Sequence, residues 1–313
     1  MLQVITSIED IKQRVKTFKE NQLSIGFIPT MGALHEGHLS LVRQAKEEND
    51  KVVVSIFVNP LQFGINEDFT QYPRTFDNDR KLLSKENVDV VFNPKASEMY
   101  PKGFCTSVIM GDLEDRLCGK SRPGHFRGVA TIVMKLFNLI NPDIAYFGQK
   151  DFQQTVVIKR VVADLNLGVN IKVLPTVRGK EGLALSSRNA YLGETEKKDA
   201  LCLYNALTKA KDMVNAGTKN AEEIKAEMEK IVNNCKSAKI DYISIVNPVT
   251  LETVPEVRSG DVAALAVRIG KTRLIDNIIL FFLIAVVWIN LNVQEIQSCG
   301  CSANFSSLTS YAN

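Results

Sequence analysis

The stretch from Leu23 to Asn49 passes from an apolar run, through a turn that contains glycine, into a helical pattern. Leu23–Ile28 is predicted to be a strand, and His38–Asn49 has the apolar spacing of a helix. The sequence that joins them is Pro29-Thr30-Met31-Gly32-Ala33-Leu34-His35-Glu36-Gly37-His38. Such a turn exposes free backbone N–H groups at the positive end of the helix dipole. The stretch therefore predicts a strand–turn–helix unit of an α/β fold with an anion-binding position at the turn.

The turn holds two of the three histidines in the chain. His35 and His38 stand three residues apart, so both rings can face one ligand once the helix has begun. Gly37 leaves no Cβ between them, and Gly32 lets the turn tighten. This pattern favours contact with the phosphates of a nucleotide. Two alternatives stay open: a metal-binding pair, for which the nearby sequence offers no third histidine or cysteine, or a structural cap of the helix.

Strands and helices alternate along residues 1–176. Because parallel strands joined by helices form a doubly wound sheet, we predict a Rossmann-like α/β domain here. Ligands of such sheets bind beyond the carboxyl ends of the strands. Further predicted strands are Val52–Val58, Val88–Phe92, Ile144–Phe147 and Ile171–Leu174. Further predicted helices are Asp77–Asn87, Val129–Ile140 and Phe152–Leu165.

The pattern changes after Arg188, and we predict a smaller α+β domain over residues 177–280. Its expected helices are Lys197–Asn215 and Ala221–Asn234, and its expected strands are Ile240–Val246 and Val262–Ile269.

Residues 281–313 are treated as an atypical extension, apolar first and then polar. The apolar run Ile278–Ile289 is shorter than the roughly 20 residues that span a bilayer. It is open to three interpretations: a buried strand or helix, an interfacial anchor, or a non-native extension. We favour an extension without a role in catalysis and expect no membrane contact through it.

Composition indicates a soluble enzyme with enough chain for two domains. The 313 residues hold 38 Lys plus Arg against 35 Asp plus Glu, and the resulting charge of +3 does not call for a nucleic-acid partner. The N-terminus lacks the pattern of a signal peptide. None of the six cysteines forms a Cys-x-x-Cys pair, so we expect reduced thiols and a cytoplasmic location.

The sequence resembles the pantothenate synthetase (pantoate–β-alanine ligase) family of His-x-Gly-His nucleotidyltransferases, over roughly Met1 to Leu280. The resemblance is carried by the turn described above and by four later segments in the same order. These are Val58-Asn59-Pro60-Leu61-Gln62-Phe63, Arg122-Pro123-Gly124-His125-Phe126-Arg127-Gly128, Phe147-Gly148-Gln149-Lys150-Asp151 and Leu185-Ser186-Ser187-Arg188-Asn189.

The resemblance implies a Rossmann-like ATP-binding domain, a smaller lid domain and a homodimer. It also implies a two-step reaction: pantoate and ATP form pantoyl adenylate and pyrophosphate, and β-alanine then displaces AMP to give pantothenate. Two other functions stay open. One is another His-x-Gly-His adenylyl- or cytidylyltransferase, and the other is a non-catalytic nucleotide-binding module that associates with membrane through its tail.

The resemblance also assigns residues to the nucleotide. His35, His38, Lys150 and Arg188 are the implied catalytic residues, with His38 as the usual proton donor, either neutral or charged. Adenylation builds negative charge on phosphate oxygens, so fixed positive charge and positioning should supply most of the catalysis. The implied ATP-binding residues are Met31, Gly32, Ala33, Leu34, His35, Glu36, Gly37, His38, Gly148, Gln149, Lys150, Asp151, Val177, Leu185, Ser186, Ser187 and Arg188.

Pantoate and a metal complete the expected ligands. Gln62 and Gln154 match the pantoate-binding glutamines of the family, and Asn59 is expected to orient the same pocket. ATP chemistry implies Mg²⁺ held mainly by phosphates, with Asp79, or else Asp77, as the contributing carboxylate. His125 is open to a structural or a functional role.

Overall fold

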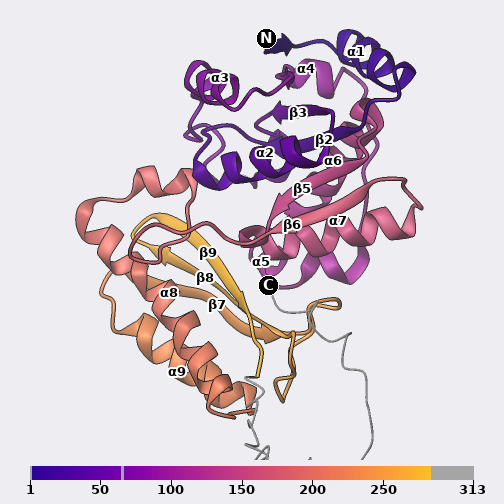
Figure 1. Ribbon diagram of the computed structural model, residues 1–313. Coiled ribbons are helices and arrows are strands. Elements are labelled where there is room, and N and C mark those ends of the chain that lie inside the picture. Colours follow the sequence, from indigo (N-terminus) through magenta and orange to yellow (C-terminus); the bar gives the residue numbers. More distant parts are fainter. Residues whose placement is uncertain (1, 65–66, 283–313) are drawn as a thin grey trace, which may run out of the picture. The chain divides into compact units, whose positions relative to one another are not determined.

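A six-stranded parallel sheet forms the first part of the chain (Figure 1). The computed structural model describes residues 2–64 and 67–282. Neighbouring strands follow the order β1-β4-β3-β2-β5-β6, and every pair is parallel. The strands are β1 (Gln3–Ile5), β2 (Ile25–Thr30), β3 (Lys51–Ile56), β4 (Val90–Phe92), β5 (Ile144–Gly148) and β6 (Asn170–Leu174). The predicted doubly wound sheet is therefore confirmed, and its strand order reverses between β2 and β5.

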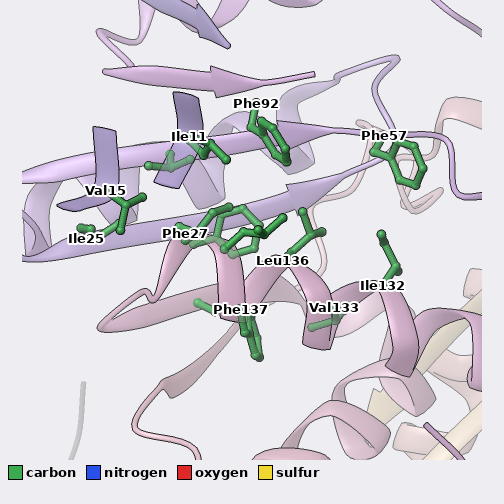
Figure 2. Close-up of a cluster of buried hydrophobic side chains, with 14 of the residues drawn as sticks. Ile11, Val15, Ile25, Phe27, Phe57, Phe92, Ile132, Val133, Leu136 and Phe137 are labelled. Atoms are coloured by element: carbon green, nitrogen blue, oxygen red, sulfur yellow. The ribbon is translucent and has the colours of Figure 1, made fainter. Parts of the chain in front are cut away.

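Helices cover both faces of this sheet, because successive strand side chains point to opposite faces. On one face Phe27 packs with Ile11 and Val15 of α1 and with Leu136 and Phe137 of α6 (Figure 2). On the other face the apolar sides of α2 and α3 pack against β2, β3 and β4. The helices of this part are α1 (Ile8–Glu20), α2 (Glu36–Glu48), α3 (Phe76–Lys85), α4 (Ala96–Met99), α5 (Cys118–Ser121), α6 (His125–Ile140) and α7 (Phe152–Asp164).

The later part of the chain forms a second, α+β core, as predicted. Its helices α8 (Glu194–Asn215) and α9 (Ala221–Asn233) pack on an antiparallel sheet of order β7-β8-β9. The strands are β7 (Ala238–Val246), β8 (Val262–Ile269) and β9 (Thr272–Ile279). Strand β9 was not predicted, and it includes the first residues of the apolar run Ile278–Ile289. Residues 283–313 lie outside the described residues, so the interpretation of the extension stays a prediction. The boundary between the two domains at residue 176 also stays a prediction.

Four short 3-10 turns complete the described structure, and three of them border the site. They are η1 (Pro60–Gln62), η2 (Gly111–Asp115), η3 (Gln149–Asp151) and η4 (Ser187–Tyr191). No helix in residues 2–64 and 67–282 is both long and apolar enough to cross a membrane.

Candidate active site

One pocket lies where the carboxyl ends of β2 and β5 meet, beside the point where the strand order reverses. It brings together four residues predicted to be catalytic, His35, His38, Lys150 and Arg188, from three separate segments of the chain. Other predicted residues in its lining are Met31, Gly37, Asn59, Gln62, Gly148, Asp151, Gln154, Val177, Leu185, Ser186 and Ser187. The remaining residues predicted to bind ATP do not line the pocket but stand in the same segments of the chain; they are Gly32, Ala33, Leu34, Glu36 and Gln149.

The two histidines cap helix α2 and face the pocket at the same time. Nδ1 of His35 accepts a hydrogen bond from the backbone N–H of Gly37 at 3.2 Å. Nδ1 of His38 accepts one from the backbone N–H of His35 at 3.3 Å, and the ring centroids are 4.1 Å apart. His35 and His38 therefore cap the helix and also line the pocket. A capping role does not exclude contact with a phosphate.

The capping bonds fix the tautomer of both rings. Because each Nδ1 atom accepts a hydrogen bond, the proton of each neutral ring must lie on Nε2. Burial, followed by the charge of Lys150, lowers the pKa of His35 to about 4. Burial, the neighbouring His35 and Lys150 lower the pKa of His38 well below its usual value. Near pH 7 both rings of the free protein are therefore neutral Nε2–H donors.

Asp79 stabilises the turn that leads to His35, and it does not line the pocket. Its carboxylate is fully buried and accepts hydrogen bonds of 2.9 Å from the backbone N–H groups of Ala33 and Leu34. Gly32 and Ala33 both have positive φ angles, 82° and 50°, so the turn is one that needs such support. The structure does not bring Asp79 to the pocket, and the exposed Asp77 does not line it either. Both Asp79 oxygens accept hydrogen bonds within this turn, and the role of Asp79 as a metal ligand stays a prediction.

Asp151 is the one carboxylate that lines the pocket among the described residues. It ends turn η3 next to Lys150, and it is exposed to solvent. The described residues contain no group of three or more His, Cys, Asp or Glu side chains arranged to hold a metal by themselves. A divalent cation here would therefore need oxygen ligands from a bound phosphate as well.

Lys150 stands in turn η3, directly after strand β5. Within the described residues no ion pair or hydrogen bond engages its Nζ atom, whereas most arginines that border the site are paired with carboxylates. Its charge lowers the pKa of both pocket histidines. This ammonium group is a source of positive charge that faces the same space as the two imidazoles.

The Ser-Ser-Arg segment joins the pocket from the later part of the chain. Ser186 caps η4 by accepting from the backbone N–H of Arg188 at 3.3 Å, and Ser187 Oγ donates to the carbonyl of Ala33 at 3.0 Å. The guanidinium of Arg188 donates two hydrogen bonds of 2.8 Å to Asp68 and lies over the ring of Tyr72. Arg188 is therefore held beside the pocket in an ion pair that no sequence motif indicates.

Asn59 and Gln62 form one buried amide pair. Asn59 is 1% exposed, and its Nδ2 donates to the Gly128 carbonyl at 3.1 Å and to Gln62 Oε1 at 3.2 Å. Its Oδ1 accepts from the hydroxyl of Tyr100 at 2.7 Å. Asn59 thus fixes which way the Gln62 amide faces, in agreement with its expected orienting role. Tyr100 was missed, because an isolated tyrosine carries no signal of such a contact.

His125 lies behind the Gln62 segment rather than in the pocket lining. Its Nδ1–H donates to the carbonyl of Gln62 at 2.7 Å, and its Nε2 accepts from Arg122 at 3.0 Å. Arg122 is itself paired with Glu67 through two bonds of 2.6 Å. Burial and Arg122 lower the pKa of His125 to about 3. Of the two roles left open for His125, these contacts support the structural one.

The fold and the site together define a class: an α/β protein that carries a His-x-Gly-His turn at the reversal point of a parallel sheet. The family model for pantoate-beta-alanine ligase matches residues 3–279. A pantothenate synthetase from Caldicellulosiruptor bescii is 54% identical over 276 residues, which cover 88% of this chain and 98% of the relative. The chain therefore belongs to the pantoate–β-alanine ligase family.

Solved structures agree with this family. The structure of pantothenate synthetase from Thermus thermophilus matches with a TM-score of 0.85 and 42% identity, over 89% of this chain and 99% of that one. A pantoate-beta-alanine ligase from Francisella tularensis, complexed with beta-gamma ATP and β-alanine, matches with a TM-score of 0.75 and 37% identity. That match covers 89% of this chain and 98% of the other.

Proposed function

We propose that this chain is an ATP-dependent ligase that joins pantoate to β-alanine through a pantoyl adenylate. The observation that supports the proposal most strongly is the gathering of His35, His38, Lys150 and Arg188 around one pocket. The pantothenate synthetases to which the chain is similar, and the ATP and β-alanine complex of the Francisella relative, point to the same reaction.

In the first step a carboxylate oxygen of pantoate attacks the α-phosphorus of ATP. The new O–P bond forms as the bond from the α-phosphorus to the bridging oxygen breaks, and pyrophosphate leaves with that electron pair. Negative charge grows on the phosphate oxygens, so preorganised donors stabilise the transition state more than the ground state. Lys150 supplies a full positive charge, and the Nε2–H groups of His35 and His38 supply neutral donors that burial keeps uncharged.

Pantoate carries two methyl groups, two hydroxyls and a carboxylate, and the pocket has matching walls. Val129, Ile132, Val133 and Leu136 of α6 line its apolar side. Gln62 and Gln154 line its polar side, where each amide can both donate to and accept from a hydroxyl or a carboxylate. In the second step the neutral amine of β-alanine attacks the acyl carbon of the adenylate, and AMP leaves with the electrons of the acyl–oxygen bond.

ATP chemistry adds Mg²⁺ to the proposal. A single lining carboxylate beside a triphosphate fits the preference of Mg²⁺ for phosphate oxygens, water and one or two carboxylates. Asp151 lines the pocket, and we propose that it contributes that carboxylate. Bound Mg²⁺ would neutralise phosphate charge, in addition to what Lys150 does. The homodimer and the cytoplasmic location remain proposals that rest on the family resemblance and on composition.

The test is an assay of AMP and pyrophosphate release in which ATP, pantoate and β-alanine are each omitted in turn. The proposal predicts sustained release of both products only with all three substrates. Another His-x-Gly-His transferase would release pyrophosphate with a phosphorylated or sugar-like acceptor and would not respond to β-alanine. Turnover that is independent of pantoate or of β-alanine would contradict the proposal.

A further inference from the structure

Two neighbouring residues of strand β9, Asp276 and Asn277, bind two different segments of the chain that lie next to the pocket. Asp276 and Asn277 are 3% and 2% exposed, and both side chains bind groups in loops. Asp276 Oδ1 also accepts from the backbone N–H of Asn277 at 2.8 Å. The backbone of β9 is fixed by antiparallel pairing with β8, in which Asp276 lies opposite Leu265 and Asn277 opposite Ala264. Buried polar side chains on a rigid strand are suited to hold more pliable segments in place.

Asn277 binds the backbone of the loop that carries Lys150. Its Nδ2 donates to the carbonyl of Gln149 at 2.9 Å and to the carbonyl of Lys150 at 3.0 Å. Its Oδ1 accepts from the side chain of Gln149 at 3.3 Å. Turn η3 is only three residues long, so its carbonyls have few partners within the turn itself. The Asn277 amide supplies partners to two of them.

Asp276 binds the hairpin that precedes the Ser-Ser-Arg segment. Its two oxygens accept from Arg178 Nη1 at 2.5 Å and from Nη2 at 3.0 Å, and Arg178 also donates to the carbonyl of Gly182 at 3.1 Å. The hairpin closes through a bridge between Arg178 and Ala184 and a bond from the backbone N–H of Leu185 to the carbonyl of Val177. Ser186 follows at once, so the position of the hairpin sets the position of Ser186–Arg188.

We propose that Asp276 and Asn277 are positioning residues for adenylation, which fix the placement of Lys150 relative to Ser186–Arg188. Both residues line a smaller cavity that shares Lys150, Asp151 and Gln154 with the pocket, and each binds a loop next to the pocket. A displacement of about 1 Å at a reacting centre can lower a rate about a hundredfold, so a loosened loop has a measurable effect. This inference rests on the proposed ligase function, because it concerns the rate of its first step.

The first experiment replaces the amide of Asn277 with an isosteric carboxylate. Asn277→Asp keeps the shape and removes the donor, so the carbonyls of Gln149 and Lys150 lose their partner. The rate of pantoyl adenylate formation in a single turnover should fall about 10- to 100-fold, while the Kd for ATP, measured by calorimetry, should change less than about 3-fold. Asn277→Asp also adds a negative charge beside the Lys150 loop, so Asn277→Ala, which removes the donor without adding charge, is measured against the same criteria.

A matched control comes from a turn asparagine in the same α+β part of the chain. The Oδ1 atom of Asn247 accepts from the backbone N–H groups of Val249 and Thr250, away from the pocket. Asn247→Ala removes these turn contacts and should lower the Tm while leaving the adenylation rate as in the parent chain. Equal rate losses in Asn247→Ala and Asn277→Asp would overturn the proposal, because general destabilisation would then explain both.

A double-mutant cycle with Lys150→Ala separates positioning from a purely structural role. If Asn277 acts by holding Lys150, Asn277→Asp should change the rate less than about 3-fold once the ammonium group is gone.

Asp276→Asn should weaken ATP binding more than Asn277→Asp does, because it releases the hairpin that leads to Ser186–Arg188. Fully additive rate losses in the cycle would overturn the assignment for Asn277, and unchanged ATP affinity in Asp276→Asn would overturn it for Asp276.

The outcome for the parent chain separates this inference from the proposed function. If the parent chain forms no pantoyl adenylate from ATP and pantoate, the ligase proposal fails, and the positioning proposal fails with it. If the parent chain forms the adenylate and Asn277→Asp forms it at the same rate, only the positioning role is overturned.

Discussion

Asp68 accepts two hydrogen bonds of 2.8 Å from the guanidinium of Arg188 at the edge of the pocket. Asp68 belongs to the segment that follows η1, where the rings of Phe63, Phe69 and Tyr72 pack together. The cation that is proposed to meet the triphosphate is therefore already paired in the free protein, through Nε and Nη2. The negative charge of Asp68 repels a triphosphate that approaches the same guanidinium, so we expect the pair to oppose ATP binding.

Asp68→Asn should strengthen ATP binding. The substitution removes both the competing partner of Arg188 and a negative charge beside the site, and we expect the Kd for ATP to fall about 3- to 10-fold, equivalent to roughly 1 kcal/mol. Calorimetric titration with ATP in the absence of pantoate measures the change. Glu252→Gln, which removes a more exposed partner of Arg116, is the control and should leave the Kd as it is. Unchanged or weaker ATP binding by Asp68→Asn would count against the account.

Lys150→Ala should lower the rate of adenylation far more than the affinity for ATP. Removal of one preorganised donor to a developing charge typically lowers the catalytic rate about 10²- to 10³-fold, and we expect a loss of that size. The measurement is the single-turnover rate of pantoyl adenylate formation. Lys159→Ala, on an exposed position of helix α7, serves as the control. A Lys150→Ala rate equal to that of the control would contradict the catalytic role.

Gln62→Ala should weaken the binding of pantoate more than the binding of ATP. The Gln62 amide is held by Asn59 and faces the polar side of the pocket, and the loss of one such hydrogen bond costs about 1 kcal/mol, or roughly a fivefold rise in Kd. Separate calorimetric titrations with pantoate and with ATP test the difference. Gln44→Ala, in a half-buried glutamine of α2 that binds Glu48 and does not line the pocket, is the control. Equal losses for the two ligands would mean that Gln62 is not a pantoate residue.

The stability of the free protein should fall as the pH drops below about 6.5. The pKa of His125 is lowered to about 3 in the folded chain, so between these values the unfolded chain binds a proton that the folded chain does not. Stability therefore rises with pH across this window, with a limiting slope of about 1.4 kcal/mol per pH unit for each such histidine. His35, with a pKa of about 4, acts in the same direction.

His125→Asn isolates this contribution. The asparagine amide can still donate to the carbonyl of Gln62, but it takes up no proton. Urea unfolding at pH 7.5 and pH 5 should show that the parent chain loses about 2 kcal/mol more than the variant between the two conditions. An equal loss in the two chains would show that protonation of His125 is not linked to unfolding.

Much of the fold followed from local patterns in the sequence. Mainly apolar runs such as Val52–Val58, which includes β3, predicted buried parallel strands, and the structure confirms them. Strand β1 has only three residues, too few for a periodic signal, and β9 was missed because Arg273, Asp276 and Asn277 interrupt its apolar pattern. Helix α6 begins four residues earlier than predicted, at His125, because Gly124 takes a left-handed conformation at its N-cap.

The site could be predicted only as far as its residues stand in contiguous motifs. The histidine turn, the Lys150 loop and the Ser-Ser-Arg segment each have a recognisable sequence, and the structure brings them to one pocket. The contacts of Asp68 and Asn277 join segments more than a hundred residues apart, and no local pattern encodes such pairs. Asp79 was expected to contribute a metal ligand. The backbone N–H groups of Ala33 and Leu34, to which its carboxylate binds, reach it only because α3 packs beside their turn, and no local pattern encodes that packing.

The most direct test of the central claim is a rapid-quench experiment with ATP labelled at the α-phosphate and pantoate, without β-alanine. If the imidazoles, the ammonium and the guanidinium act on one triphosphate, about one equivalent of pantoyl adenylate should form per pocket, together with an equal amount of pyrophosphate. Added β-alanine should then convert the adenylate to pantothenate and AMP. The absence of any labelled adenylate before the amine is added would contradict the account.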